Sequence, residues 1–244
     1  MRNLSRSSPL PLYHQLKEYL RSQVDDGVLK PGDAVPSERE LCARHGISRM
    51  TVSKAISTLV NEGVLYREQG KGTFVALPKP SCGFSQLTGF TENMEKAGLP
   101  HETRLLSFEE ESASRQLQET LQLSPENVSI FNILRLRFVE GEPFSLEQVW
   151  LPVERAPGLD AARLDGQSLY ALLRGDYEVR LSYARQTVEP VLSSEFESRM
   201  LELKAETPVL LFCRVAYDTR GVPVEYSKCV YRGVRFKYEM AFHV

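Results

Sequence analysis

The chain has 244 residues, of which 42% are hydrophobic and 25% are charged, as in a folded protein rather than a disordered one. No apolar run reaches 18 residues and the start lacks the apolar core of a signal peptide, so neither a membrane helix nor a secretion signal is expected. The net charge of −2 is unevenly divided: residues 1–77 carry 11 Lys+Arg against 8 Asp+Glu, and the remainder carries 19 against 24. A basic module joined to an acidic one indicates that only the first contacts a polyanion.

The four cysteines are scattered along the chain and form no C-x-x-C pair. We therefore expect reduced thiols in a cytoplasmic protein, not a disulfide framework. They are Cys42, Cys82, Cys213 and Cys229.

The first part of the chain predicts two helices. Residues 11–26 carry apolar side chains at steps of three and four, which is the spacing of an amphipathic helix, and Gly27 ends it. A short second helix is expected to begin after Ser37. Glu40 would complete a capping box with Ser37, and Gly46 would end that helix.

A third helix and a hairpin are expected next. Ser48 is the N-cap that we predict for the helix, and Gly63 stops it. Two helices joined by a tight glycine-containing turn are typical of a helix-turn-helix. Short strand-like runs at 64–67 and 73–75 then flank a glycine-rich basic turn, as in a wing. We predict a winged helix-turn-helix over residues 1–77.

Residues 78–86 contain two prolines and predict a semi-stiff linker. From 87 to 244 the pattern predicts an α+β domain with a mainly antiparallel sheet. Its expected strands are 103–109, 129–139, 144–151, 179–190, 208–217, 222–231 and 234–243. Its expected helices lie near 91–97, 113–121, 168–174 and 194–203.

A weak internal repeat lies within this second half. The stretch that begins at Arg135 and leads to a strand with Glu147 resembles the stretch that begins at Arg214 and leads to a strand with Glu225. Each copy reads as strand, G-x-P turn and strand, so the repeat predicts a pseudo-two-fold sheet.

The third helix and the wing carry the residue types that DNA contacts require. Small or hydrogen-bonding side chains suit base edges, cations suit phosphates, and a glycine-rich tip is thin enough to approach a groove. The alternative for each cation is an ordinary solvated charge. The predicted DNA-binding residues are Arg39, Ser48, Arg49, Thr51, Ser53, Lys54, Gly70, Lys71 and Gly72.

Four segments of the first 77 residues resemble the GntR family of bacterial regulators: PLYHQL (11–16), PGDAVPSEREL (31–41), SRMTVSKA (48–55) and GKGTFV (70–75). The resemblance covers residues 9–76 and implies a DNA-binding module. Ser53 departs from the family, which commonly has arginine there. That departure implies an operator different from the usual one.

The second half resembles the HutC-type (UTRA) effector domain of that family, which has the chorismate lyase fold. Short stretches carry the resemblance: LTGFTENM (87–94), RLR (135–137), SLY (168–170), PVEYS (223–227) and YRG (231–233). Val234 departs from many relatives, which have aspartate. Similar regulators of amino-sugar use bind a sugar phosphate at these positions. The resemblance implies that an anionic group is held by Phe90, Thr91, Arg135, Arg137, Ser168 and Tyr170, and the polar body of the ligand by Glu147, Glu225 and Tyr231.

Strand alternation agrees with this pocket. Arg135 and Arg137 are two residues apart and share a face, and a guanidinium pair suits a phosphate or carboxylate. Glu225 and Tyr231 also share a face if no bulge intervenes. The alternative is a cross-strand ion pair, of Arg137 with Glu147 or Glu225.

Catalysis is not expected, because the four histidines form no metal-binding spacing and neither a G-x-S-x-G elbow nor a P-loop occurs. We predict a homodimeric repressor that binds double-stranded operator DNA and a small anionic effector without metal or cofactor. A phosphorylated amino sugar is the leading effector, ahead of a carboxylate such as urocanate. Two alternatives stay open: a DNA-binding dimer with no effector, and a lyase-like enzyme with a DNA tether.

Overall fold

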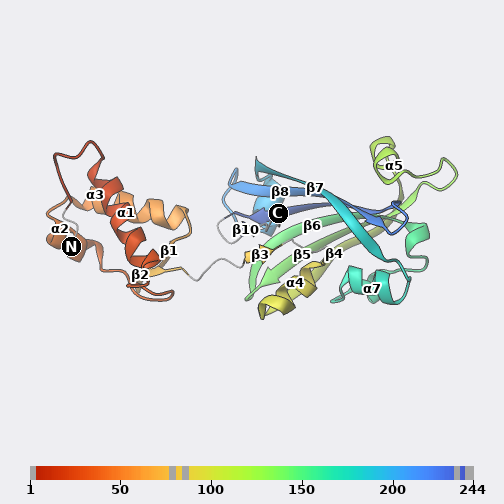
Figure 1. Ribbon diagram of the computed structural model, residues 1–244, viewed down its shortest axis with the longest axis horizontal. Helices are drawn as coiled ribbons and strands as arrows, with labels where there is room; N and C mark the ends of the chain where they lie inside the picture. The colour runs from red at the N-terminus through yellow and green to blue at the C-terminus, as the bar shows by residue number, and fades with distance from the viewer. Residues whose placement is uncertain (1–3, 77–80, 84–87, 234–236, 240–244) are drawn as a thin grey trace, which may run out of the picture. The chain divides into compact units, whose positions relative to one another are not determined.

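A computed structural model describes residues 4–76, 81–83, 88–233 and 237–239 (Figure 1). The chain divides into two compact units, Met1–Lys79 and Pro80–Val244. None of the described helices is long and apolar enough to cross a membrane.

The first unit is the predicted winged helix-turn-helix. Its elements are α1 (Leu12–Asp25), α2 (Glu38–His45), α3 (Arg49–Asn61), β1 (Leu65–Glu68) and β2 (Gly72–Val75). The expected capping box is present: the backbone N–H of Glu40 donates to Oγ of Ser37 at 3.2 Å, and the backbone N–H of Ser37 donates back to Oε2 of Glu40 at 2.8 Å. Gly46 ends α2 in the left-handed conformation, with φ of 62°, where glycine avoids a steric penalty.

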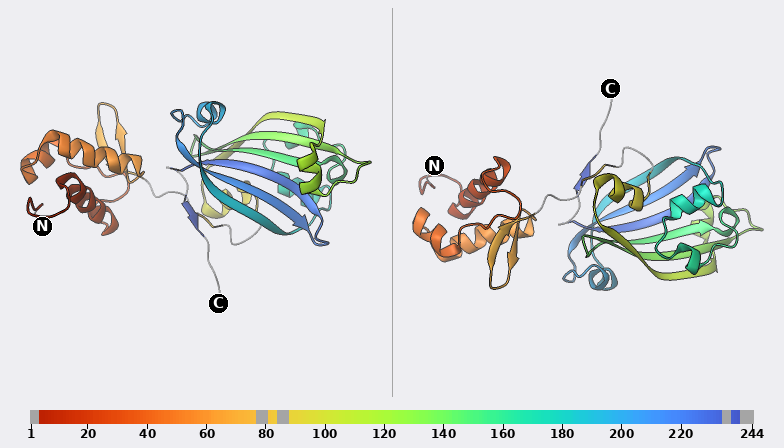
Figure 2. Two further views of the ribbon diagram at one scale, coloured as in Figure 1. Left: turned by 90° about the horizontal axis from the view of Figure 1, so that it is seen from above. Right: turned by 90° about the horizontal axis from the view of Figure 1, so that it is seen from below.

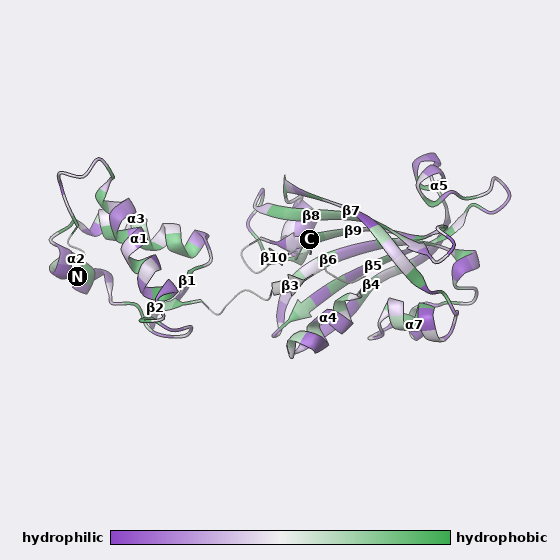
Figure 3. Cartoon of the chain, viewed as in Figure 1, coloured by the Kyte–Doolittle hydropathy of each residue, from purple (hydrophilic) through white to green (hydrophobic). Residues whose placement is uncertain are grey.

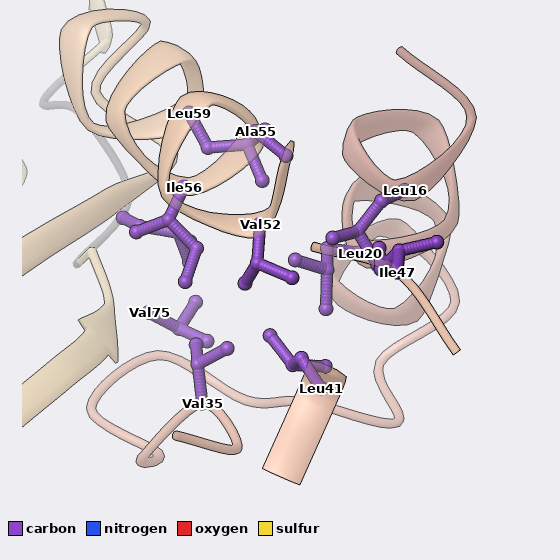
Figure 4. Close-up of a cluster of buried hydrophobic side chains, with 11 residues drawn as sticks. Leu16, Leu20, Val35, Leu41, Ile47, Val52, Ala55, Ile56, Leu59 and Val75 are labelled. Atoms are coloured by element: carbon purple, nitrogen blue, oxygen red, sulfur yellow. The ribbon is translucent and has the colours of Figure 1, made fainter. Parts of the chain in front are cut away.

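One apolar cluster holds this unit together (Figure 4). Leu16 and Leu20 from α1 meet Val52 and Ile56 from α3, and Leu41 adds the contribution of α2. All five are at most 2% exposed, so each contributes roughly 1.5–3 kcal/mol of burial free energy. The packing fixes the angle between α2 and α3 and leaves the opposite face of α3 outside.

The second unit is built on a six-stranded antiparallel sheet with strand order β4-β5-β6-β9-β8-β7. Figures 1 and 2 show α4 and α7 on the same face of this sheet. The strands are β4 (His101–Ser112), β5 (Ser129–Val139), β6 (Glu142–Pro152), β7 (Leu181–Leu192), β8 (Pro208–Asp218) and β9 (Pro223–Arg232). The helices are α4 (Phe90–Ala97), α5 (Arg115–Leu121), α6 (Ala161–Leu164), α7 (Leu169–Gly175) and α8 (Glu195–Met200), with a 3-10 turn η1 (Val153–Arg155).

The strand order is symmetric about the β6–β9 pair, as the sequence repeat predicts. Each half contains the series helix, strand, helix, strand, strand: α4-β4-α5-β5-β6 and then α7-β7-α8-β8-β9. The register corrects one detail of the repeat. Arg135 lies opposite Glu147, but its counterpart Arg214 lies opposite Ser227, so Glu225 is not the equivalent of Glu147.

Both faces of the sheet carry apolar clusters, and Figure 3 shows hydrophobic and hydrophilic residues interspersed along the strands. On one face, Ile133 and Leu151 pack against Leu173 of α7. On the other, Leu136 and Val230 form a cluster with Leu201, the residue that follows α8. Successive side chains of a strand alternate between the two faces. The apolar residues buried on each face therefore determine the face to which the polar residues of the same strand point.

The structure differs from the sequence prediction at four elements and in the ends of several strands. The α6 helix and η1 were not expected, and α5 begins at Arg115 rather than 113 because Ser114 accepts from the backbone N–H of Leu117 and caps it. Residues 81–83 of the expected linker form β3 (Ser81–Gly83), paired in parallel with β10 (Lys237–Glu239). The rest of the expected strand 234–243, including Val234, lies outside the described residues, as does the side chain of Cys82.

Candidate functional site

The outer face of α3 carries most of the predicted DNA-binding residues. Ser48 caps the helix: its Oγ accepts from the backbone N–H of Thr51 at 3.2 Å, and the two hydroxyl oxygens are 2.8 Å apart. Arg49 is free to reach outward, because 87% of its side chain is exposed. Ser53 is half-buried one turn later. The face therefore presents one long cation and several short polar groups.

Glu38 at the start of α2 organises two arginines beside this face. It lies 3.5 Å from Nε of Arg49 and 3.3 Å from Nη2 of Arg67, which also donates to Oγ of Ser57 at 3.3 Å. Neither Glu38 nor Arg67 was predicted from the sequence. Strand alternation gives no signal for Arg67, because it shares a face with the buried Leu65 two residues earlier although its own side chain is exposed. Arg39, the next residue of α2, is exposed.

The remaining predicted cations have local partners. Nζ of Lys54 lies 4.1 Å above the ring of Tyr13, so this cation is tied to α1. Lys71 at the wing tip is exposed and lies 2.6 Å from Glu68. Gly70 and Gly72 on either side have φ of 78° and 132°, values that favour glycine and make the tip thin.

A pocket lies in the second unit between α4, α7 and the inner face of the sheet. All nine residues predicted for effector binding line it, and they come from five different elements and one helix cap. Its volume of about 50 Å³ is small beside the roughly 300–1,000 Å³ of ordinary ligand pockets. The pocket is thus formed but narrow.

Two buried arginines and one glutamate occupy one side of the pocket. Oε2 of Glu147 accepts from Nη2 of Arg135 at 2.5 Å and from Nη2 of Arg137 at 2.6 Å. Burial by itself raises the pKa of the Glu147 carboxyl, but the attraction of the two guanidinium groups outweighs it and lowers that pKa to about 2. The cross-strand ion pair considered as an alternative is therefore present, and it lies inside the pocket.

The two guanidinium groups keep spare hydrogen-bonding capacity. Arg135 and Arg137 are 2% and 4% exposed, yet Nη1 of Arg135 and Nε of Arg137 find no acceptor among the described residues. Arg137 also donates to Oγ1 of Thr103 at 3.1 Å and stacks at 4.6 Å on the ring of Phe90. Buried donors without acceptors are costly, and an anion in the pocket would satisfy them.

The other side of the pocket has two hydrogen bonds, one between α7 and β9 and one between β8 and β7. The hydroxyl of Tyr170 donates to Oε1 of Glu225 at 2.6 Å, and Nε of Arg214 donates to Oε1 of Gln186 at 2.8 Å. Glu225 is 3% exposed, and burial raises the pKa of its carboxyl although Tyr170 donates to it. The pocket thus holds one carboxyl whose pKa is lowered by two arginines and another whose pKa is raised by burial.

Tyr231 faces the same pocket as Glu225, since no register shift intervenes between them. Ser168 caps α7 by accepting from the backbone N–H of Ala171 at 3.3 Å, and Thr91 lies in the first turn of α4. Sequence reasoning missed several lining residues: Thr88, Asn93, Gln186, Arg214, Ser227 and Cys229. The repeat pointed to Arg214, as the counterpart of Arg135.

Nothing in the described residues resembles a catalytic or metal centre. No group of three or more His, Cys, Asp or Glu residues in the described ranges is placed to hold a metal ion. Of the described histidines, His14 and His45 lie in the first unit, and His101 packs edge-on against Phe90 outside the pocket lining.

Comparison with known proteins assigns both units. The family model "Bacterial regulatory proteins, gntR family" matches residues 12–75, and the model "UTRA domain" matches residues 96–237. The chain is 36% identical to the HTH-type transcriptional repressor NagR of Bacillus subtilis (strain 168), over 97% of this chain and 96% of that protein. It is 30% identical to the probable fructoselysine utilization operon transcriptional repressor of Escherichia coli (strain K12), over 92% and 91% of the two chains.

A solved structure supports the same assignment. PhnF from Mycobacterium smegmatis matches with a TM-score of 0.67 and 28% identity, over 95% of this chain and 98% of that one. The chain belongs to the GntR family of bacterial transcription regulators, which are not enzymes, and its second unit is a UTRA effector domain.

Proposed function

We propose that this protein is a repressor that binds operator DNA as a homodimer in the cytoplasm, and that a phosphorylated amino sugar controls its affinity for DNA. The observation that carries the effector proposal is the pair of buried arginines with unsatisfied donors. The likeness to a repressor named NagR and the resemblance to regulators of amino-sugar use support the same ligand class. Dimeric binding follows the usual geometry of helix-turn-helix proteins on near-palindromic operators.

The chemistry of the pocket suits a ligand with an anionic end and a polar body. A phosphate would accept from Nη1 of Arg135 and Nε of Arg137, and Thr91 would add a hydroxyl at the start of α4. The carboxyl of Glu225 and the hydroxyl of Tyr231 would take hydroxyl or amino groups of the sugar. The other residues that line the pocket would contact the rest of the ligand.

A pocket of about 50 Å³ must widen to admit such a ligand. The elements that cover it are α4 and α7, which are joined by an ion pair of Glu92 with Arg174 and by the packing of the Tyr170 ring 3.6 Å from the Cβ position of Gly89. Ligand entry therefore changes the start of α4. That helix follows the segment that leads from the DNA-binding unit.

This geometry supports control by linkage. An effector that binds one arrangement of α4 more tightly than another shifts the conformation of residues 88–98, and through the linker it shifts the spacing of the two recognition helices. A coupling free energy of about 1–3 kcal/mol would change operator affinity by about 5- to 150-fold. Saturating effector that leaves operator affinity unchanged would contradict this mechanism.

A thermal-shift panel tests the proposal. Glucosamine 6-phosphate, N-acetylglucosamine 6-phosphate, glucose 6-phosphate, glucosamine, inorganic phosphate and urocanate are each added to the purified full chain. A ligand at about 100 times its Kd stabilises the protein by about 2.7 kcal/mol. We expect a shift with a phosphorylated amino sugar that far exceeds the shift with the free sugar or phosphate.

Variants then assign the shift to the pocket. Arg135→Ala/Arg137→Ala should lose the shift and the ligand-dependent change in operator affinity while it keeps DNA binding. Thr91→Ala is a milder second variant that leaves the buried ion pairs intact. Arg115→Ala, on the surface of α5, is the matched control. A flat response of the wild-type protein across the panel would favour the DNA-binding dimer without an effector from this class.

A further inference from the structure

Met50 is the most exposed large hydrophobic residue among those the structure describes, at 84%. It lies in the first turn of α3, the recognition helix, where the buried stripe is formed by Val52, Ala55, Ile56 and Leu59. Met50 therefore contributes nothing to the core of its own unit. A single exposed apolar residue is common on protein surfaces, but this one lies in the first turn of the recognition helix, the part of a helix-turn-helix that contacts base edges.

The neighbours of Met50 leave it room to make a contact. Ser53 lies one turn later on the same side of the helix and is short, and Lys54 at the next position is drawn toward the ring of Tyr13. Arg49 precedes Met50 and is also almost fully exposed. The first turn of α3 thus presents the thioether of Met50 next to the guanidinium of Arg49, and the short hydroxyl of Ser53 follows one turn later.

Only one chemical group in the major groove matches that thioether. Thymine carries a C5-methyl group in the major groove, and the other bases present polar atoms there. Methionine is unbranched and polarisable, so it adapts well to a methyl surface. It cannot replace Arg49 or Lys71 on a phosphate, because its sulfur is at best a weak acceptor.

We propose that Met50 is a specificity-determining residue that reads the 5-methyl group of a thymine in each operator half-site. The inference rests on the proposed DNA-binding role of the first unit and adds a base contact to it. Ser53, one turn after Met50, is short and leaves space beside the thioether. At the base pair that Met50 contacts, the protein would distinguish thymine by its methyl group and not by a hydrogen bond.

The test removes that methyl group and nothing else. The purified full chain selects its operator from a random-sequence DNA library, and each thymine of the selected half-site is then replaced in turn by deoxyuridine. For the wild-type protein, one position per half-site should lose about fourfold in affinity, the effect of one buried methyl group. For Met50→Ala the same replacement should have no effect, and Met50→Leu should restore part of it.

Two controls separate this role from a general one. Val28→Ala removes another exposed apolar side chain of the same unit and should respond to deoxyuridine as the wild type does. Met50→Ala should keep the wild-type dependence of affinity on salt, because it removes no phosphate contact.

The outcomes are distinct. If the wild type enriches an operator but no deoxyuridine position lowers its affinity, or if Met50→Ala shows the same loss, the inference is overturned and the proposed function stands. If the wild type enriches no sequence, the proposed DNA-binding role fails and the inference fails with it.

Discussion

Arg135 binds Glu147 through two nitrogens that converge on one oxygen: Nε and Nη2 lie 3.0 Å and 2.5 Å from Oε2. Arg137 donates to the same Oε2, so one carboxylate oxygen balances two buried cations. The third nitrogen of Arg135, Nη1, is left without an acceptor among the described residues. Loss of the Glu147 charge would therefore leave two buried cations unbalanced, and Nη1 of Arg135 could donate a hydrogen bond to an anion in the pocket.

Glu147→Gln should strongly destabilise the second unit. It removes the charge that neutralises two buried guanidinium groups, and breaking a buried pair in this way costs about 3–5 kcal/mol. Trp150, the single tryptophan, lies in this unit, so its fluorescence during urea unfolding reports on this unit. Glu119→Gln, which breaks an exposed pair with Arg115, is the matched control and should cost less than about 1 kcal/mol. Equal losses in the two variants would contradict the prediction.

The same carboxylate predicts an acid-dependent loss of stability. The pKa of Glu147 is lowered from 4.5 to about 2, so the folded form holds the charge more strongly than the unfolded chain does. Its contribution is therefore complete above pH 4.5 and is lost as the pH falls from 4.5 toward 2. Urea unfolding followed by Trp150 fluorescence should show a steeper decline in this window for the wild type than for Glu147→Gln. Parallel curves would show that other groups dominate.

Tyr170→Phe should destabilise the second unit by about 1–3 kcal/mol, because Glu225 loses its donor inside the pocket. Tyr177→Phe makes the same chemical change where the hydroxyl has no hydrogen-bond partner among the described residues, and it should be close to neutral. The Tyr170 variant should also weaken effector binding while it leaves the DNA affinity of the ligand-free protein unchanged. A larger loss of stability in Tyr177→Phe than in Tyr170→Phe would contradict the stabilising role assigned to the Tyr170 hydroxyl.

Local patterns in the sequence predicted the parts of the molecule that local contacts determine. The capping box of Ser37 and Glu40 and the cap at Ser48 need a few consecutive residues, and both were confirmed. Strand alternation correctly placed Arg135 and Arg137 on one face, because the side-chain period of a strand is two.

Contacts between distant segments were not predictable in the same way. The pairing of Arg214 with Gln186 depends on the register of β8 against β7, and no spacing rule connects those residues. The cation–π contact of Lys54 with Tyr13 depends on how α1 packs against α3. The effector residues on α4 and α7 came from the family resemblance, since neither helix reveals in its own sequence that it covers a pocket.

Two variants of the wing should change DNA affinity in opposite directions. Lys71 lies 2.6 Å from Glu68, so part of its charge is balanced within the protein before DNA is bound. Lys71→Ala should weaken binding to the operator and to unrelated DNA by similar factors, and lower the slope of log affinity against log salt by about 1. Glu68→Gln frees Lys71 and removes a charge that repels phosphate, so it should strengthen binding to both DNAs. Fluorescence anisotropy over a series of salt concentrations measures both effects. A Lys71→Ala variant that loses affinity for the operator alone would show that the wing reads bases.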